Sequence, residues 1–448
     1  MIETISNCFD SHVHLLATGQ VASELKLGHI KNFNDLKNIN VQPHQLRGDW
    51  LVGFGWNEND WNIADKDLKL HRSTLDRLFP DRPVFFSRVD GHTSWINSKA
   101  IQTLESMGYD FNIEVQGGQI LRDEQGQLIG LLKDQAHIKA LLMLPEYSEV
   151  QLEKFMIKAG QIFNCGGFTH VRDLSMTFRQ WQIQKRLCES GQLKLYTEGF
   201  VTVENLNDFD RGFSDLQKCV KNPSDFLKIK GLKIFVDGSL GSETAYLSQN
   251  YLGKNHQGLL CWPENDIKLM IEKCWQNKIE IAIHTIGDQA VHTVATLARQ
   301  ISAAGLIGKI HLEHCQILRP ETLQLLKPLH VFVHMQPCHW LSDHHWINSK
   351  IGDLHKYLFQ WEMIRKNKIH LDFGSDSPIE PAQLLLNQKA LELSALNGIP
   401  KLGEDWKKFH SYPKTPMGKA WGHCETHFDS QEICAVYFNG EKLNIQLR

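Results

Sequence analysis

From about residue 148 onward, short apolar runs alternate with stretches in which apolar residues recur at helical spacing. Ser148 and Gln151 have the spacing of a helix-capping box, and apolar positions at helical spacing continue to Gly166-Gly167. One strand candidate opens the chain and ends at His14. Seven more follow at 168–173, 195–203, 232–236, 279–283, 310–314, 331–334 and 370–374, with helical stretches such as 288–304 between most of them.

Strands that alternate with helices indicate parallel strands joined by crossover helices, and eight such units are the number in a (β/α)8 TIM barrel. Between the first strand and the second, however, the chain is far longer than the ~30 residues of one βα unit. We therefore predict an α/β barrel with a large insertion after strand 1. The predicted domains are the barrel (1–19 and 148–380), an insertion capping the barrel mouth (20–147) and a C-terminal tail (381–448) with a helix near 382–397 and a remnant strand at 433–438.

The composition narrows the class of protein. The chain has 448 residues, of which 42% are hydrophobic and 22% charged, as in an ordinary globular protein. Its net charge is near −3 without a long basic stretch, which argues against nucleic acid as a partner. No window approaches the ~18 uncharged apolar residues of a membrane-spanning helix, and no signal-peptide pattern opens the chain. The ten cysteines form no C-x-x-C pair, so we expect reduced thiols in a cytoplasmic protein.

Histidine is abundant, with 23 residues. Because histidine is a common metal ligand, the position of each one in the predicted fold must be used to distinguish candidate ligands from the rest. His12 and His14 lie on the same face of the first strand, about 6.6 Å apart at Cα. Two imidazoles so placed can both reach one ion at about 2.1 Å. Alone, this pair also fits two polar residues on an exposed strand face.

Three further polar residues end strands on the face that points into the barrel. His284, His314 and Asp376 end strands five, six and eight, at the rim where TIM-barrel enzymes build their active sites. A hydrogen-bonded core histidine or a helix-capping aspartate would explain any one of them. Together with His12 and His14 of the first strand, these residues lie at the ends of four strands, and this shared position favours a metal site.

Lys233 points into the barrel, because Leu232, Ile234 and Val236 form the apolar outer face of its strand. A bare buried ammonium is costly. One interpretation is a salt bridge with Asp237, Asp372 or Asp376. The other is reaction of the neutral amine with carbon dioxide to give a carbamate that bridges two cations.

These residues resemble the amidohydrolase superfamily, from Phe9 to about Pro378. Within it, the most similar subgroup is the one that contains N-substituted formamide deformylase. The motifs that carry the resemblance are Phe9-Asp10-Ser11-His12-Val13-His14, Gly53-Phe54-Gly55-Trp56, Asp90-Gly91-His92 with Asn97-Ser98-Lys99-Ala100, Lys233-Ile234-Phe235-Val236-Asp237-Gly238-Ser239, His284-Thr285-Ile286-Gly287-Asp288, Glu313-His314-Cys315-Gln316 and Gly374-Ser375-Asp376.

The resemblance implies a hydrolase of non-peptide carbon–nitrogen bonds in a small molecule, with divalent metal, commonly Zn²⁺, and a carbamylated Lys233 between two ions. The chain departs from the pattern at both ends. Only eight residues precede Phe9, so the family's small β-sandwich is expected to be reduced or absent. The segment 406–427 replaces the usual one after strand eight, and the oligomeric state stays open, a homo-oligomer included.

Our leading hypothesis places His12, His14 and Asp376 on one metal and His284 and His314 on the other, with the Lys233 carbamate between them. Asp376 takes the proton from the attacking water and passes it to the leaving amine.

Several other residues have two interpretations. His92, in the insertion, either contacts the oxyanion or substrate, as the resemblance suggests, or is a loop histidine. Asp288 is expected to cap the helix after strand five. His334 is a candidate for lining the pocket. Trp56, Trp61 and Trp95 form either an apolar lid or the core of the insertion.

Two alternatives remain. A mononuclear zinc deaminase of a ring amine would use His12, His14, His284 and Asp376 with an unmodified Lys233. A barrel without catalysis would serve as a binding or regulatory protein.

Overall fold

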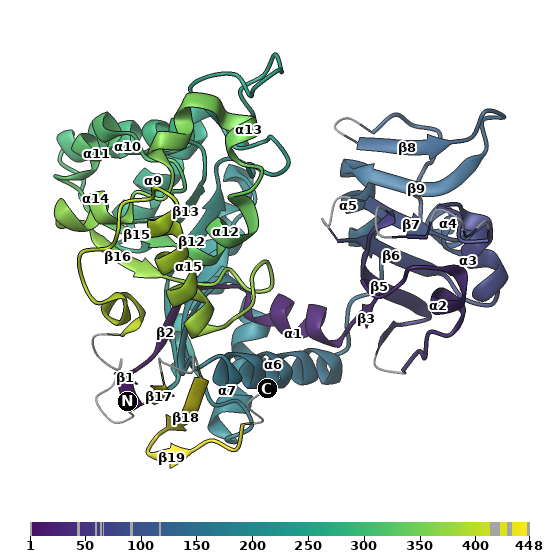
Figure 1. Cartoon of the computed structure of the whole chain (residues 1–448), viewed down its shortest axis with the longest axis horizontal. Helices are drawn as coiled ribbons and strands as arrows, with labels where there is room; N and C mark the ends of the chain where they lie inside the picture. The colour runs from purple at the N-terminus through teal and green to yellow at the C-terminus, as the bar shows by residue number, and fades with distance from the viewer. Residues whose placement is uncertain are drawn as a thin grey trace. The chain divides into compact units, whose positions relative to one another are not determined.

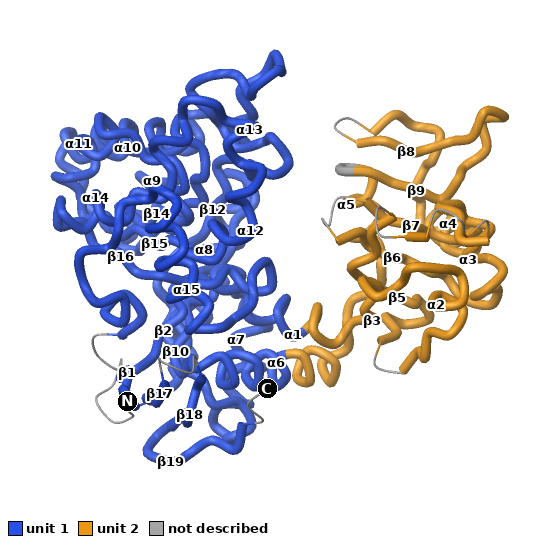
Figure 2. The backbone as a smooth tube through the Cα atoms, in the orientation of Figure 1, with its two compact units in different colours: residues 1–19, 156–448 blue, residues 20–155 orange. Residues whose placement is uncertain are grey.

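The computed structural model describes residues 2–42, 45–58, 61–62, 65, 67–89, 93–115, 118–412, 422–427 and 432–445. The chain divides into two compact units, coloured separately in Figure 2. Unit 1 contains residues 1–19 and 156–448, and unit 2 contains residues 20–155. In the part of the chain that is described, no helix has both the length and the apolar character needed to cross a membrane.

Unit 1 is built on an eight-stranded parallel sheet with the order β16-β15-β14-β13-β12-β11-β10-β2. A parallel bridge between Val13 and Ser377 joins its two ends, so the sheet closes as a (β/α)8 barrel. The eight predicted strands are all present, with small shifts of their ends. They are β2 (Phe9–Val13), β10 (His170–Met176), β11 (Tyr196–Thr202), β12 (Leu227–Phe235), β13 (Glu280–Thr285), β14 (Lys309–His314), β15 (His330–Met335) and β16 (His370–Phe373).

The alternation of side chains along these strands produces two cores. Ile281 and Ile283 of β13 are fully buried in the large cluster between sheet and helices, as the apolar outer face predicted. Ala282, between them, packs inside the barrel with Leu174 and Phe200. The period of two therefore fixes which residues can line the barrel interior, and with it the site.

Helices cover the outside of the sheet, and Figure 1 shows α9, α10, α11 and α14 beside the barrel strands. The helices that follow the strands of unit 1 are α7 (Phe178–Glu189), α8 (Phe209–Lys221), α9 (Glu264–Gln276), α10 (Asp288–Ala303), α11 (Pro320–Leu326), α12 (Pro337–Asp343), α13 (Asn348–Ile351), α14 (Trp361–Lys366) and α15 (Leu384–Leu396). Before them, α6 (Glu149–Cys165) starts at the predicted box, where Ser148 N–H donates to Gln151 Oε1 over 3.1 Å.

Asp288 does not cap α10, which corrects the sequence prediction. The N-cap is Gly287, and no side chain caps this helix end. The Asp288 carboxylate instead accepts from the Ser248 N–H over 3.0 Å and pairs with Arg319 at 2.9 Å. It lies in the first helical turn, where the dipole still favours a negative charge, and ties two loops to the helix.

Residues near both ends of the described chain form a four-stranded antiparallel sheet in the order β1-β17-β18-β19, where a reduced or absent β-sandwich was expected. Its strands are β1 (Ile2–Ser6), β17 (His423–His427), β18 (Glu432–Phe438) and β19 (Glu441–Lys442). β18 covers the predicted remnant strand at 433–438. The residues before Phe9 are therefore paired with the tail.

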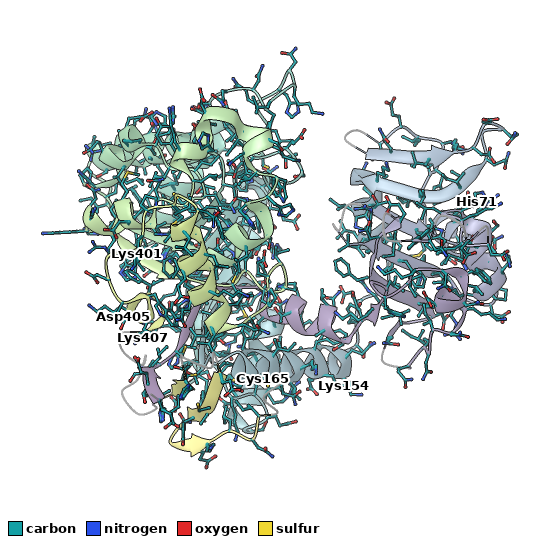
Figure 3. All side chains as sticks on the ribbon, in the orientation of Figure 1. His71, Lys154, Cys165, Lys401, Asp405 and Lys407 are labelled. Atoms are coloured by element: carbon teal, nitrogen blue, oxygen red, sulfur yellow. The ribbon has the colours of Figure 1, made fainter. Side chains whose placement is uncertain are left out.

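The tail also braces the first barrel strand. The short 3-10 helix η5 (Trp406–His410) places His410 so that its Nδ1 donates to the Phe9 carbonyl over 3.1 Å. Tyr412 donates its backbone N–H to the Asn7 carbonyl over 3.1 Å. Lys407 pairs with Asp405, both labelled in Figure 3, at 3.2 Å and also with Glu3. The start of the chain is held by a segment about 400 residues later.

Unit 2 has its own sheet, in the order β3-β5-β6-β7-β9-β8 with β4 paired to β5. The strands are β3 (Leu25–Lys26), β4 (Leu46–Arg47), β5 (Trp50–Trp56), β6 (Val84–Arg88), β7 (Thr93–Ile96), β8 (Gly118–Arg122) and β9 (Leu128–Asp134). The helices within it are α2 (Phe33–Lys37), α3 (Arg72–Leu78), α4 (Ser98–Ser106) and α5 (Gln135–Leu142), and α1 (Leu15–Ser23) and α6 cross the boundaries between the units.

The three tryptophans of the insertion belong to the core of unit 2. Trp56 and Trp95 are each 1% exposed, and Trp61 packs against the same cluster. Their ring centroids lie 5.6–6.1 Å apart. Of the two interpretations of these residues, the structure supports the core.

Candidate metal centre

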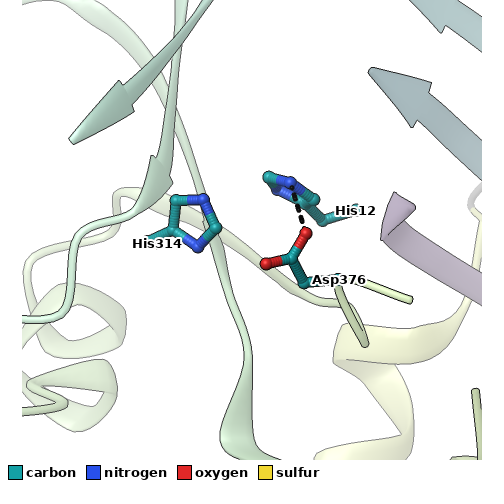
Figure 4. Close-up of side chains that lie close together, drawn as sticks. All are labelled: His12, His314 and Asp376. Atoms are coloured by element: carbon teal, nitrogen blue, oxygen red, sulfur yellow. Dashed lines mark ion pairs between the residues drawn. The ribbon is translucent and has the colours of Figure 1, made fainter. Parts of the chain in front are cut away.

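Three predicted ligands from three strand ends meet inside the barrel. One ligand atom from each of His12, His314 and Asp376 lies within 4.8 Å of the others, and all three side chains are buried. Figure 4 shows the two imidazoles and the carboxylate pointing toward one another. Among the described residues, this is the only such group of histidine, cysteine or acidic side chains.

Asp376 lies between the two histidines of the first strand. Its Oδ1 is 3.2 Å from His12 Nε2 and 3.3 Å from His14 Nε2. His14 is 21% exposed, whereas His12 is 1% exposed, so the pair spans the inner and outer sides of the site. Burial raises the pKa of Asp376, but the neighbouring imidazoles outweigh this and hold it well below its usual range. The carboxylate is ionised at neutral pH.

His284 completes the inner side of the cluster, with its ring centroid 4.5 Å from that of His314. Burial and, to a smaller extent, the nearby Lys233 lower the pKa of His284 to about 3. Burial also holds the pKa of His314 well below its usual value. Both imidazoles are neutral at pH 7, the state in which histidine can ligate a metal.

Lys233 has no hydrogen-bond partner among the residues that the structure describes. It is fully buried, its Nζ donates no hydrogen bond to any of them, and the ring centroid of Phe235 lies 4.8 Å away. Burial lowers its pKa to about 8. The structure therefore does not contain the salt bridge that was one interpretation of this lysine.

The acidic residues proposed as partners of Lys233 are engaged elsewhere. Asp237 accepts the backbone N–H groups of Tyr246, Ile286 and Gly287 at 2.8–3.0 Å. Asp372 is bonded to His370 at 2.7 Å. Both carboxylates organise loops and strand ends. The charges of Glu313 and Asp376 still act on the Lys233 amine, but neither forms a hydrogen bond with it.

Two other predicted residues, His334 and His92, do not appear among the residues that form the cluster. His334 is buried, and its Nε2 is 2.9 Å from His311 Nδ1 on the neighbouring strand. His92, with Asp90 and Gly91, lies outside the described residues.

Sequence reasoning missed the residues that hold the histidines in place. Glu313 and Gln336 each contact an Nδ1 atom, at 2.7 Å from His12 and 2.9 Å from His314. His339 lies with Nε2 3.5 Å from Asp376 Oδ2. Glu313 directly precedes the predicted ligand His314, and Gln336 lies two residues after His334, the candidate for lining the pocket; this proximity was the available signal.

The backbone at the site adopts a conformation that L-residues rarely take. His314, Cys315 and Asp376 have φ values of 67°, 48° and 61°. Such left-handed residues cost on the order of 1–3 kcal/mol each and cluster at functional sites. Here they turn the ligand-bearing strand ends toward the barrel axis.

The sequence and the fold have known relatives. Residues 9–386 match the amidohydrolase family. A putative amidohydrolase of Bacillus subtilis, YtcJ, is 29% identical over 388 residues, which are 84% of this chain and 70% of that protein. The LONG AFTER FAR-RED 3 protein of Arabidopsis thaliana is 26% identical over 397 residues, 84% of this chain and 66% of that protein. The chain belongs to the amidohydrolase family and is, by class, a hydrolase.

Two solved structures share the fold. An uncharacterized metal-dependent hydrolase from Pyrococcus furiosus matches with a TM-score of 0.69 at 26% identity, over 87% of this chain and 76% of that one. A similar protein from Pyrococcus horikoshii OT3 matches with a TM-score of 0.72 at 24% identity, over 91% and 80%.

Proposed function

We propose that this protein is a metal-dependent hydrolase that cleaves a non-peptide carbon–nitrogen bond of a small molecule, as expected from the resemblance of its motifs to the deformylase-like subgroup. The observation that carries the proposal is the convergence of His12, His314 and Asp376 within 4.8 Å. The metal-dependent hydrolase from Pyrococcus furiosus, which has the same fold, supports it.

The donor set fits zinc. Imidazole nitrogen and carboxylate oxygen are the ligands that Zn²⁺ takes in catalytic sites. His12, His14 and Asp376 would hold one ion, and His284 and His314 a second. Lys233 fits the role of a bridge, because its pKa of about 8 leaves part of the amine neutral near pH 7.5 and able to react with carbon dioxide. The carbamate would replace an unpartnered ammonium with an anion beside the cations.

The chain's own residues account for proton transfer. When bound, a divalent cation at such a site lowers the pKa of a water molecule toward 7 and polarises the substrate carbonyl. Asp376, ionised and within 3.3 Å of both His12 and His14, is placed to accept the proton from the water. It then returns that proton to the leaving amine, which makes it general base and general acid in turn.

The decisive experiment combines metal content with a test for the carbamate. The protein is prepared with zinc and bicarbonate, its metal is measured by elemental analysis, and the carbamate carbon is sought by ¹³C NMR after labelling with ¹³C-bicarbonate. We expect two ions per chain and a carbamate signal that Lys233→Met abolishes. One ion without a carbamate would favour the mononuclear deaminase, and no metal would refute the proposal.

Activity is tested on a panel of N-formyl and N-acyl amines, with wild-type protein and Asp376→Asn. Loss of general acid–base catalysis lowers rates by about 10²–10⁴-fold. We expect at least that loss, because the same carboxylate is also a metal ligand. Equal rates for both proteins would contradict the role of Asp376.

A further inference from the structure

Directly behind the metal cluster, the barrel interior contains a buried ion pair between Arg172 and Glu313. Arg172, on β10, donates from one terminal nitrogen to Glu313 Oε1 over 2.8 Å and from the other to Oε2 over 3.1 Å. The second nitrogen also reaches the Ser11 carbonyl over 3.1 Å. The guanidinium lies 4.4 Å from the ring centroid of Phe200. Both charged side chains are at most 1% exposed.

A two-point contact of this kind fixes the plane of the carboxylate. The Glu313 carboxylate is fully buried, so rotation would break a charge-assisted hydrogen bond that solvent could not replace. Its Oε2 therefore has a defined position, and that position is 2.7 Å from His12 Nδ1. An ionised carboxylate only accepts hydrogen bonds, so His12 must present a protonated Nδ1 to it.

The hydrogen bond at Nδ1 determines which nitrogen of the His12 ring can bind a metal. Because Nδ1 donates to Glu313, Nε2 is the nitrogen that would give up its proton to a metal, and it lies 3.2 Å from Asp376 Oδ1. We propose that Arg172 and Glu313 are positioning residues that set the tautomer and ring orientation of His12 and so tune the metal affinity of the site. This inference rests on the metal site proposed above.

The other histidines of the cluster are held by weaker acceptors. His314 Nδ1 meets the neutral amide oxygen of Gln336, and His284 Nε2 meets the backbone carbonyl of Gly238. Of His12, His284 and His314, only His12 has an Nδ1 that is hydrogen-bonded to a charged side chain, and that side chain is itself paired with Arg172. We therefore expect His12 to be the ligand whose geometry is most strongly fixed before metal arrives.

Glu313→Gln tests the inference directly. The amide keeps the shape and an acceptor for Arg172, but offers an N–H to His12 Nδ1 and thus favours the tautomer with the proton on Nε2. Loss of such a partner lowers metal affinity by about 10–100-fold. Co²⁺ is titrated into metal-free protein, and binding is followed by the visible absorption of the bound ion, without any substrate.

A matched control comes from the neighbouring strand. Glu280 accepts from His311 Nε2 over 2.9 Å, which makes the same carboxylate–histidine pair in the same barrel without a predicted ligand. Glu280→Gln should leave the Co²⁺ affinity within about twofold of wild type. If Glu313→Gln also stays within twofold while wild type binds Co²⁺, the inference is overturned and the metal site stands. If wild type does not bind Co²⁺, the proposed function itself fails.

Glu313→Gln leaves Arg172 as an unpaired buried cation, which by itself could unfold the protein. Arg172→Met with Glu313→Gln removes that cation and keeps the amide next to His12. We expect this double variant to regain thermal midpoint but not Co²⁺ affinity, whereas recovery of both would assign the pair a merely structural role. As a check that needs no variant, ¹⁵N NMR of the zinc-loaded wild type should show a proton on His12 Nδ1, and its absence would refute the inference.

Discussion

At the scale of single residues, Lys233 is the most unusual group in the protein. A buried ammonium without a partner is expensive, and the usual remedy is a shifted pKa or a counter-ion. Here burial lowers its pKa to about 8, and none of the described residues forms a hydrogen bond with its amine. The metal-free protein therefore keeps a destabilising group at the position where a ligand is needed.

This arrangement predicts a pH dependence of stability. The pKa of Lys233 is about 8 in the folded state and 10.5 for the ordinary side chain. Between these pH values the unfolded chain binds a proton that the folded chain does not, so the free energy of unfolding rises with pH. The full gain is on the order of 3 kcal/mol, because each pKa unit corresponds to about 1.4 kcal/mol.

Urea unfolding of metal-free protein in carbon-dioxide-free buffer measures the effect. Wild type and Lys233→Met are compared from pH 7 to 10.5, and the difference isolates this lysine from other groups that titrate. We expect the variant to be more stable near pH 7 and to lose that advantage as the pH rises. Parallel curves would show that Lys233 is not strained by burial.

At the scale of elements, the site depends on the seam where β16 meets β2. Gly374, directly after β16, lies against the first strand. A Cβ at this position would be 2.6 Å from the His12 nitrogen and 3.0 Å from Asp10 Oδ1. Asp10 Oδ1 in turn accepts the Ser375 N–H over 2.8 Å. The strand that carries His12 and the turn that carries Asp376 are thus in direct backbone contact.

Gly374→Ala should push these two elements apart. We expect a loss of about 1–3 kcal/mol in stability, as for other overpacked sites, together with weaker Co²⁺ binding. Gly241→Ala is the control, since its Cβ would meet only the Trp346 side chain at an ordinary 3.7 Å. Chemical unfolding and Co²⁺ titration of both variants measure these two effects. Unchanged Co²⁺ affinity in Gly374→Ala would show that metal binding does not depend on the contact between β16 and β2.

The elements were also where the sequence was most informative. All eight barrel strands could be predicted from their apolar runs, and the period of two placed His284 inside the barrel. The period does not account for His314, which is in phase with Ile310 and Leu312 of the outer face; the positive φ of 67° at His314 interrupts the alternation. The partners of these residues could not be predicted. Arg172 and Glu313 lie on separate strands 141 positions apart, and nothing local in either strand indicates their contact.

At the scale of the whole molecule, the chain consists of two units with separate cores. Unit 2 has its own sheet and two apolar clusters, one of them built around Trp56 and Trp95. A unit with its own core can in principle fold alone. The sequence predicted an insertion at 20–147, and the compact unit spans residues 20–155. That the insertion caps the barrel mouth stays a prediction.

Residues 20–155 expressed alone should therefore fold cooperatively. We expect a single sigmoidal unfolding transition in urea and a near-ultraviolet circular dichroism signal from the packed tryptophan rings, since these rings lie 5.6–6.1 Å apart within the unit. Trp95→Phe should weaken that signal more than Trp50→Phe. A gradual transition without a near-ultraviolet signal would show that unit 2 needs the barrel.

The closure of the barrel determines when the metal site can form during synthesis of the protein. The hydrogen bond between Ser375 and Asp10 spans 365 positions, so His12 leaves the ribosome long before Asp376. Unit 2 can fold while His12 and His14 still lack their partner. The metal-binding cluster cannot form until Asp376 has been synthesised and has left the ribosome. A chain that stops before that point lacks the full ligand set. Tight metal binding would thus show that translation has passed residue 376. Brief exposure of the growing chains to metal at successive stages of synthesis would detect that point.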